Sequence, residues 1–162
     1  MDKPFERTPP LDIDAWFAAL DRFEIEYLIV GGVAVGFHAE PRFTKDLDVL
    51  VHVSSDTVAR LVDALREFGA PMHLVKAEEL LKEDFVIFFG NPPWRIDILT
   101  SIPGVNFREA YGDRITVTLG NRKVNCISKQ WLIRAKQASG RHQDLADIDA
   151  LLASPDSDEI KH

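Results

Sequence analysis

The sequence predicts an α/β (α+β) fold, in which a small mixed β-sheet is flanked by helices and followed by C-terminal helices. Two observations predict it. Short apolar runs bounded by Gly and Pro alternate along the chain with segments whose apolar residues recur at helical spacing. The length of 162 residues and the hydrophobic content of 46% suffice for one domain with a sizeable core. We expect a single domain over residues 1–153 and a polar tail over residues 154–162.

The first half of the chain contains two strands between amphipathic helices. Its first helix carries an aromatic stripe, which we assign to the core and not to base stacking. Gly31 and Gly32 end the first apolar run, and Pro41 forces a break before the second. The elements expected here, in chain order, are helix 12–23, strand 27–30, helix 33–39, strand 47–53 and helix 57–68.

The second half of the chain contains two predicted hairpins and two closing helices. Turn residues separate the paired runs at Gly90–Pro93 and at Gly120–Asn121. Ser128 is a typical N-cap, and Gly140 is expected to end the helix that Ser128 begins. The elements expected here are helix 77–82, strands 85–89 and 94–99, helix 106–111, strands 114–118 and 123–127, and helices 129–139 and 141–153.

Asp46 and Asp48 stand two residues apart at the start of the second strand. Residues i and i+2 of a strand point to the same face, so both carboxylates project into one small volume while Leu47 and Val49 point towards the core. Two like charges at this distance repel each other unless a cation lies between them. Hard divalent cations prefer oxygen ligands, and Mg²⁺ is commonly held by one or two carboxylates plus substrate phosphates. The pair therefore predicts a divalent-cation site.

The glycine pair Gly31-Gly32 lies between the first strand and a short helix. Glycines let backbone amides approach a phosphate closely, and the start of a helix favours negative charge. A phosphate-binding turn beside a carboxylate pair predicts a site for a nucleoside triphosphate and its metal ion.

A strand, Gly31-Gly32, a short helix and then Asp46-Leu47-Asp48 on the next strand resemble the nucleotidyltransferase superfamily of the polymerase-beta type. The stretch from Arg42 to Asp48 is most similar to the branch that contains the AbiEii and MenT toxins and their small stand-alone relatives. The resemblance covers roughly residues 25–152 and implies the nucleotidyltransferase fold. It also implies Mg²⁺- or Mn²⁺-dependent transfer of a nucleoside monophosphate from an NTP such as ATP to a hydroxyl group of a tRNA, a protein or a small molecule.

Asp97 lies between Ile96 and Ile98 in a predicted strand. An isolated buried carboxylate is costly, so Asp97 either faces solvent or belongs to a polar site. The resemblance implies the polar site: Asp97 would be a third carboxylate, which bridges the catalytic metal and activates the acceptor hydroxyl, while Asp46 and Asp48 ligate both metals.

Thr44 and Lys45 directly precede the carboxylate pair. They either contact phosphates or the acceptor, or they only cap the entry to the strand.

The segment that follows Lys136 resembles the closing motif of the same branch, a Lys followed by Arg141-x-x-Asp144-x-x-Asp147. The resemblance implies that Lys136 approaches the nucleotide phosphates and that the aspartates help to hold the site together. The alternative is a solvated helix face with an ion pair of little consequence. The apolar face of this last helix is expected to consist of Leu145, Ile148 and Leu152.

Composition narrows the function classes. A net charge of -7 argues against a broad, sequence-independent grip on nucleic acid and weakens the case for tRNA as the acceptor. The chain has no apolar run of membrane-spanning length, so we expect a cytoplasmic protein that does not bind membranes. The single cysteine, Cys126, is expected to be a buried structural thiol.

Two function classes remain after the site is considered. The first is an active nucleotidyltransferase, either alone or as a component of a toxin–antitoxin system. The second is a catalytically silent nucleotide-binding or toxin–antitoxin partner domain that keeps the site without turnover. Either one is compatible with a cognate toxin or antitoxin partner or with a homodimer. An incidental acidic cluster on the surface is the third interpretation of the carboxylates.

Overall fold

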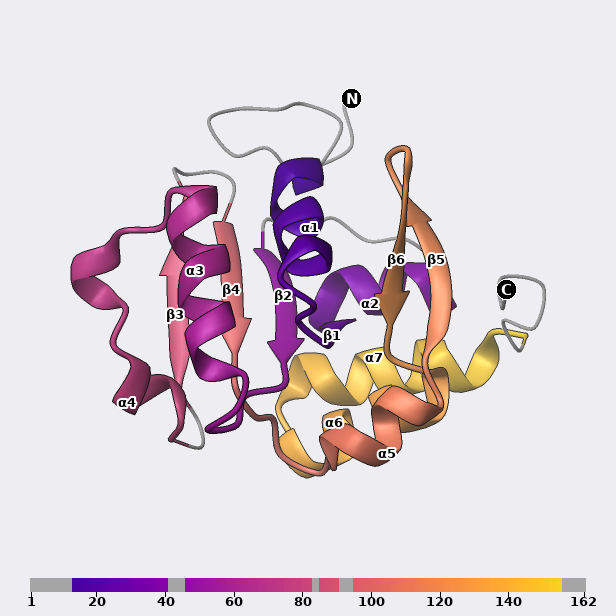
Figure 1. The fold of residues 1–162 in the computed structure, drawn as a ribbon. Coiled ribbons are helices and arrows are strands. Elements are labelled where there is room, and N and C mark those ends of the chain that lie inside the picture. Colours follow the sequence, from indigo (N-terminus) through magenta and orange to yellow (C-terminus); the bar gives the residue numbers. More distant parts are fainter. Residues whose placement is uncertain (1–12, 41–45, 83–84, 91–94, 156–162) are drawn as a thin grey trace.

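The computed structural model describes residues 13–40, 46–82, 85–90 and 95–155 (Figure 1). Thr44, Lys45, the N-terminal arm and most of the polar tail lie outside the described residues. The strands are β1 (Tyr27–Val30), β2 (Asp46–Val51), β3 (Val86–Phe89), β4 (Arg95–Leu99), β5 (Ile115–Leu119) and β6 (Arg122–Cys126). The helices are α1 (Ile13–Arg22), α2 (Gly31–His38), α3 (Val58–Phe68), α4 (Ala77–Leu80), α5 (Phe107–Gly112), α6 (Lys129–Ser139) and α7 (His142–Ala153), with a 3₁₀ turn at Met72–Leu74.

The described strands form one mixed sheet in the order β3-β4-β2-β1-β6-β5. Both predicted hairpins are present, because β3 pairs antiparallel with β4 and β5 pairs antiparallel with β6. The strands β1 and β2 are also antiparallel, whereas β4 joins β2 and β6 joins β1 in parallel. The predicted mixed α/β architecture is therefore confirmed, and β2 lies at its centre between β1 and β4.

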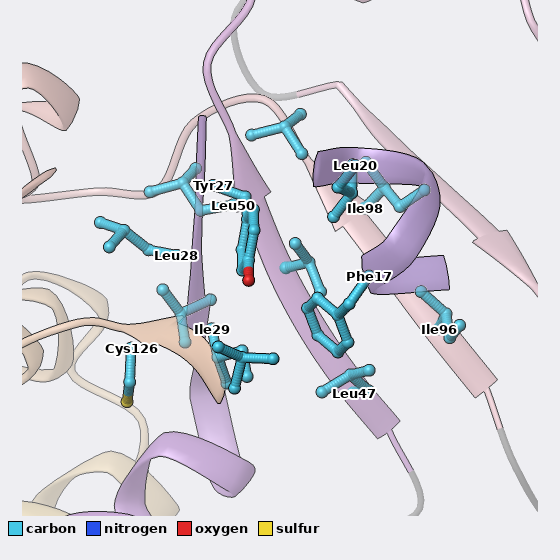
Figure 2. Packing of buried hydrophobic residues seen from close by; sticks show 14 of the residues in the cluster. Phe17, Leu20, Tyr27, Leu28, Ile29, Leu47, Leu50, Ile96, Ile98 and Cys126 are labelled. Carbon is cyan, nitrogen blue, oxygen red and sulfur yellow. The ribbon is translucent and has the colours of Figure 1, made fainter. Parts of the chain in front are cut away.

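Helices α1 and α3 lie in front of the sheet in Figure 1, and α2 lies behind it. Side chains of the central strands alternate accordingly. Figure 2 shows Phe17 of α1 beside Leu47 of β2 and Ile96 of β4, and Leu20 of α1 beside Ile98 of β4; all of these residues are buried. The aromatic stripe of α1 is therefore part of the core, as predicted. The opposite face of these strands lies next to α2 and carries polar as well as buried apolar side chains.

Cys126 ends β6 in the interior and is fully buried, as predicted. Burial raises the pKa of its thiol, so the side chain is a neutral apolar group in this position.

Helix α2 begins at Gly31, directly after β1, and not at residue 33 as the sequence suggested. Gly31 has a φ of +68°, a left-handed conformation that favours glycine. The chain therefore turns from strand to helix without an intervening loop, and both glycines belong to the first helical turn.

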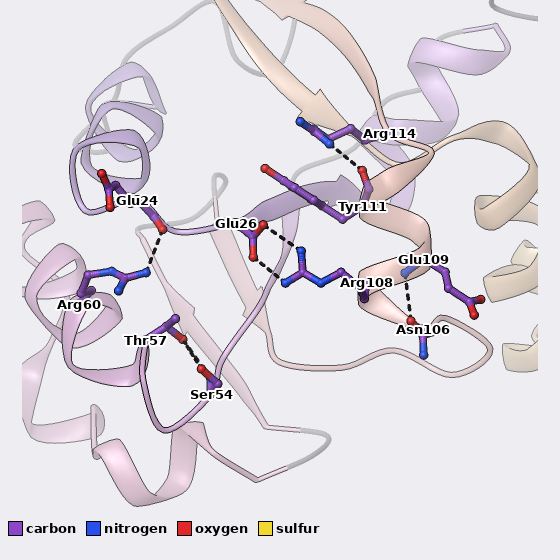
Figure 3. Close-up of polar contacts among 10 residues, drawn as sticks. All are labelled: Glu24, Glu26, Ser54, Thr57, Arg60, Asn106, Arg108, Glu109, Tyr111 and Arg114. Carbon is purple, nitrogen blue, oxygen red and sulfur yellow. Dashed lines mark hydrogen bonds and ion pairs between the residues drawn. The ribbon is translucent and has the colours of Figure 1, made fainter.

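A set of polar contacts holds α3 and α5 to neighbouring segments (Figure 3). Both terminal nitrogens of Arg108 on α5 donate to the carboxylate of Glu26, at 3.0 and 2.8 Å. These hydrogen bonds lower the pKa of Glu26. Arg60 on α3 donates to the backbone carbonyls of Phe23 and Glu24. These contacts connect helices to the chain beside β1, on elements that carry none of the predicted site residues.

The buried face of α7 differs from the predicted one. Leu145 and Leu152 are 52% and 67% exposed, whereas Leu151 is fully buried. Asp144 and Asp147, which the pattern placed on a separate polar face, point inwards beside Ile148. The predicted apolar face was right for Ile148 and wrong for the two leucines, because the inner face of the helix holds carboxylates in their place. Here a buried lysine compensates for the cost of their burial.

This orientation of α7 predicts a large effect on stability for one of two adjacent leucines and a small effect for the other. Leu151→Ala is expected to lower the free energy of unfolding by about 2–5 kcal/mol, because it leaves a cavity in the core. Leu152→Ala on the exposed side is expected to change it by less than about 0.5 kcal/mol. Urea unfolding of both variants measures the difference. Equal effects would contradict the orientation of the helix.

None of the described helices is long and apolar enough to span a membrane.

Candidate active site

The three predicted aspartates come together on one face of the sheet. Asp48 of β2 and Asp97 of β4 are directly opposite each other in the parallel pairing of these strands. Asp46 lies two residues before Asp48 and therefore on the same face, and its partner in the register is Arg95. This face is the opposite of the one that α1 covers, because the intervening Leu47 points into the core.

Asp48 packs against the beginning of α2. A Cβ atom added to Gly31 would lie 2.1 Å from the Asp48 carboxylate oxygen Oδ2, well inside any allowed contact. The position therefore requires glycine for two reasons, its positive φ and the space that the carboxylate occupies. Gly32 follows in the buried first turn of the helix. The positive end of the helix dipole thus lies beside the Asp48 carboxylate.

Burial raises the pKa of Asp48 to about 7. The negative charge of Asp97, a hydrogen bond shared with Asp97 and the charge of Asp46 act in the same direction, while the positive charge of Lys136 opposes them. In the absence of a metal ion, a proton therefore partly neutralises the Asp48–Asp97 pair near neutral pH.

Arg95 is a residue of this face that the sequence interpretation missed. Its Nε donates to Oδ1 of Asp97 at 2.7 Å, and its NH2 donates to Oδ2 of Asp97 at 3.1 Å and to Oδ2 of Asp46 at 3.3 Å. The same i, i+2 rule that paired Asp46 with Asp48 places Arg95 on the face of Asp97, so the signal was present in the sequence.

The donor set fits a hard divalent cation. Within the described ranges, no three Asp, Glu, His or Cys side chains converge as a preformed metal site. The Arg95 guanidinium instead lies between Asp46 and Asp97, and a shared hydrogen bond joins Asp48 to Asp97. A guanidinium and a proton thus supply positive charge where three carboxylates gather. Oxygen ligands of this kind suit Mg²⁺ or Mn²⁺.

The closing segment forms a buried ion cluster. Lys136 Nζ lies 3.2 Å from Oδ1 of Asp144 and 2.9 Å from Oδ2 of Asp147. Gln143 donates a further hydrogen bond to Asp147. Lys136, Asp144 and Asp147 are all buried, so the alternative of a solvated helix face is wrong. The ammonium group of Lys136 is engaged by both aspartates in this structure.

Asp144 also caps the first turn of α7, in which it is the third residue. Its Oδ2 accepts hydrogen bonds from the backbone N–H of Arg141 at 3.1 Å and from the Arg141 side chain at 2.9 Å. Burial by itself would raise the pKa of Asp144. Hydrogen bonds from Arg141, Ser139 and Lys136 outweigh that effect, and the net pKa lies below the usual range. The Asp144 side chain is therefore an ionised carboxylate at neutral pH.

The buried ion cluster of Lys136, Asp144 and Asp147 lies close to the carboxylate face. The charges of Lys136 and Arg141 both interact with that of Asp48. Helices α6 and α7 pack against each other and against α2, the helix that begins over Asp48. The structure therefore brings the two motifs of the sequence, about ninety residues apart, to one side of the sheet.

The close contact at Gly31 makes a testable difference between two glycines. Gly31→Ala is expected to lower the free energy of unfolding by more than about 2 kcal/mol, because strain from positive φ adds to the clash with Asp48. Gly120→Ala is the matched control, since Gly120 has a φ of +65° but nothing within 4 Å of an added Cβ. Its expected cost is about 1 kcal/mol, from the strain alone. Chemical denaturation measures both costs, and similar values would contradict the packing of Asp48 on α2.

Comparisons with known proteins bear on the family of the chain. The family model described as "Nucleotidyltransferase of unknown function (DUF6036)" matches residues 11–159. No curated protein sequence shows a significant match.

Several solved structures resemble the fold. An antigenic nucleotidyltransferase-like protein from Paracoccidioides brasiliensis has a TM-score of 0.51 at 19% identity, with 92% of this chain and 81% of that chain covered. The antibiotic-resistance factor ANT(2″)-Ia has a TM-score of 0.52 at 16% identity, covering 86% and 80%. The lincomycin-bound lincosamide antibiotic adenylyltransferase LnuA has a TM-score of 0.48 at 17% identity, covering 88% and 98%.

At these identities the first two structures inform on the fold alone, and they agree with the predicted nucleotidyltransferase fold. The resemblance to the nucleotidyltransferase superfamily is confirmed by the family model, whereas its AbiEii/MenT branch stays a prediction. Because that model spans nearly the whole chain, the protein belongs to the family of nucleotidyltransferases of unknown function, DUF6036.

Proposed function

We propose that this chain transfers a nucleoside monophosphate from an NTP to a hydroxyl acceptor and that Asp46, Asp48 and Asp97 hold the divalent cation, Mg²⁺ or Mn²⁺. The observation that carries the proposal is the register of β2 and β4, which sets Asp48 opposite Asp97 in a chain of this family. A carboxylate pair that shares a proton in the absence of metal is suited to exchange that proton for a cation.

The reaction forms one P–O bond, breaks another and moves one proton. The acceptor hydroxyl oxygen attacks the α-phosphorus, the bond from that phosphorus to the oxygen that bridges it to the β-phosphate breaks, and pyrophosphate leaves. Asp97, which lies opposite Asp48 in the register of β2 and β4, takes the hydroxyl proton. A divalent cation held by the three aspartates would neutralise negative charge on the phosphates. Most of the remaining work of the protein is positioning.

The other proposed residues contribute to nucleotide binding. Gly31 and Gly32 open α2, where backbone N–H groups and the helix dipole favour a phosphate. Lys136 contributes its positive charge from within the buried ion cluster and would need to leave Asp144 or Asp147 to contact a phosphate directly. Thr44 and Lys45, outside the described residues, are proposed to contact phosphates or the acceptor.

The acceptor is a tRNA, a protein side chain or a small molecule. The net charge of -7 disfavours tRNA, because binding of nucleic acid relies on basic side chains that neutralise phosphates. A role in a toxin–antitoxin system, with a cognate partner, belongs to the same proposal through the AbiEii/MenT resemblance.

A catalytically silent nucleotide-binding or toxin–antitoxin partner domain is the second candidate. The contact that favours it is the one from Arg95, which occupies both oxygens of Asp97 and one of Asp46. In a silent domain this contact would persist when the nucleotide binds.

Calorimetry with NTPs, in the presence and absence of Mg²⁺, tests the site. We expect wild-type protein to bind at least one NTP in a Mg²⁺-dependent manner and Asp46→Asn/Asp48→Asn to lose that binding. The matched control is Asp56→Asn/Asp63→Asn, two exposed aspartates remote from the site. A screen of acceptors with α-labelled NTPs then distinguishes the enzyme from the silent domain.

Absence of NTP binding by the wild type at millimolar concentration would contradict the stand-alone enzyme. Binding that survives the double substitution would show that the site lies elsewhere.

A further inference from the structure

Arg95 contacts two of the three aspartates of the carboxylate face. Its guanidinium engages both oxygens of Asp97 in a bidentate pair and reaches Asp46 as well. These contacts raise the pKa of Arg95 further, first through its hydrogen bond to Asp97, so that the group is permanently charged. We call Arg95 with Asp46 and Asp97 the Arg95 bridge.

The surroundings of the Arg95 bridge hold the guanidinium at the edge of the site. Phe88, which is opposite Asp97 in the pairing of β3 with β4, lies under the guanidinium at 4.7 Å from ring centroid to Cζ. The Arg95 side chain is 46% exposed, whereas that of Asp97 is only 10% exposed. The cation is therefore free to move towards solvent, while the carboxylate is held in place by its strand.

The Arg95 bridge uses carboxylate oxygens that a metal ion at this position would also need. A divalent cation that binds Asp46 and Asp97 needs the same lone pairs that the guanidinium now uses, and it would lie within a few ångströms of the guanidinium charge for as long as that group stays in place. The two cations exclude each other from this position.

We propose that Arg95 is the resident counter-charge of the site and that a divalent cation must displace it from Asp46 and Asp97 to bind. This inference rests on the proposed function, since it assumes that these carboxylates are the ligands. Arg95 thus acts as a positioning residue. It keeps the aspartates from repelling each other in the metal-free protein, and it lowers the affinity of that protein for the metal ion.

The exchange has a defined thermodynamic consequence. A contact that stabilises the metal-free form but not the metal-bound form must weaken metal binding by the same factor. The Arg95 bridge lies between two cases, because ion pairs with exposed partners are weak and bidentate pairs with buried partners are stronger. We therefore expect the contact to weaken metal binding by about three- to tenfold. Removal of the guanidinium should therefore tighten metal binding and destabilise only the metal-free protein.

The test uses Mn²⁺ alone as the probe, without nucleotide, on the full chain. Mn²⁺ binding is followed by electron paramagnetic resonance for wild type, Arg95→Gln and Asp48→Asn. We expect Arg95→Gln to lower the Mn²⁺ Kd about three- to tenfold relative to wild type. We expect Asp48→Asn to bind at least about tenfold more weakly. Thermal unfolding should show a lower Tm for Arg95→Gln than for wild type without metal and equal Tm values at saturating Mn²⁺.

Arg141→Gln is the matched charge control. Its guanidinium also interacts with the charge of Asp48, yet its hydrogen bonds go to Asp144 and not to Asp46 or Asp97. We expect less than about a twofold change in the Mn²⁺ Kd for this variant.

The outcomes separate the displacement of Arg95 from the proposed function. If Mn²⁺ binds and Asp48→Asn weakens it, but Arg95→Gln binds no more tightly than Arg141→Gln, the displacement is overturned and the metal site stands. If neither wild type nor Arg95→Gln binds Mn²⁺, or if Asp48→Asn binds as wild type does, the metal site and the displacement fall together.

Discussion

Asp97→Asn is expected to lower the rate of nucleotidyl transfer by at least about a hundredfold, the usual range for loss of a general base. Asparagine matches aspartate in size and keeps an oxygen that can accept the hydrogen bond from Nε of Arg95, so the packing of β4 is preserved. It cannot take a proton from the acceptor hydroxyl. The measurement is pyrophosphate release at saturating Mg²⁺ and NTP, where weaker metal binding no longer limits the rate.

The control for this experiment is Asp63→Asn, an exposed aspartate of α3 that pairs with Arg66. It is expected to leave the rate unchanged. Calorimetry on Asp97→Asn separates binding from turnover. A normal rate of transfer by Asp97→Asn would contradict the proposal that Asp97 takes the hydroxyl proton. Normal Mg²⁺-dependent NTP binding by wild type without turnover on any acceptor would favour the silent domain.

Asp144→Ala is expected to lower the free energy of unfolding by about 1.5–3 kcal/mol, the usual range for loss of a hydrogen bond between charged groups, because the substitution removes one of the two carboxylates that hold the buried Lys136. Lys136 would keep Asp147 as a partner but lose the contact at 3.2 Å, and the backbone N–H of Arg141 would lose its acceptor at the start of α7. Urea unfolding at neutral pH measures the loss. Asp149→Ala, an exposed position on the same helix, should cost less than about 0.5 kcal/mol.

The pH dependence of Asp144 provides a second readout. A carboxylate whose pKa is lowered in the folded state stabilises the protein fully above its unfolded pKa of about 3.9. That stabilisation is lost as the pH falls from there through the folded-state pKa. The difference in unfolding free energy between wild type and Asp144→Asn should therefore be constant from about pH 5 to 7 and shrink below about pH 4. A difference that does not change with pH would contradict the buried ion cluster.

The strands of the site could be predicted from the sequence because their pattern is local. The period of two along β2 places Asp46 and Asp48 on one face and Leu47 on the other, whatever the rest of the chain does. The turn residues at Gly120–Asn121 likewise determine the β5–β6 hairpin within a dozen residues. The resemblance then supplied what local pattern lacks, a role for Asp97 on a strand beside β2.

The orientation of α7 shows where local pattern fails. Counting apolar residues selected Leu145 and Leu152 for the interior, and both are exposed. The helix instead turns Asp144 and Asp147 inwards, because Lys136 from the preceding helix lies there to neutralise them. A charged side chain can be buried only if an oppositely charged partner lies beside it. Which residue is that partner depends on how α6 packs against α7, and the local sequence pattern does not contain this information.

The sequence by itself determined the elements, the paired aspartates of β2 and the glycines at the start of α2, since each depends on backbone geometry over a few residues. The tertiary structure alone decided that Asp48 is opposite Asp97, that Arg95 bridges Asp46 and Asp97, and that the buried ion cluster lies beside them. These contacts depend on strand order and on the balance between the cost of burying charge and the partners available, which only the packed chain defines.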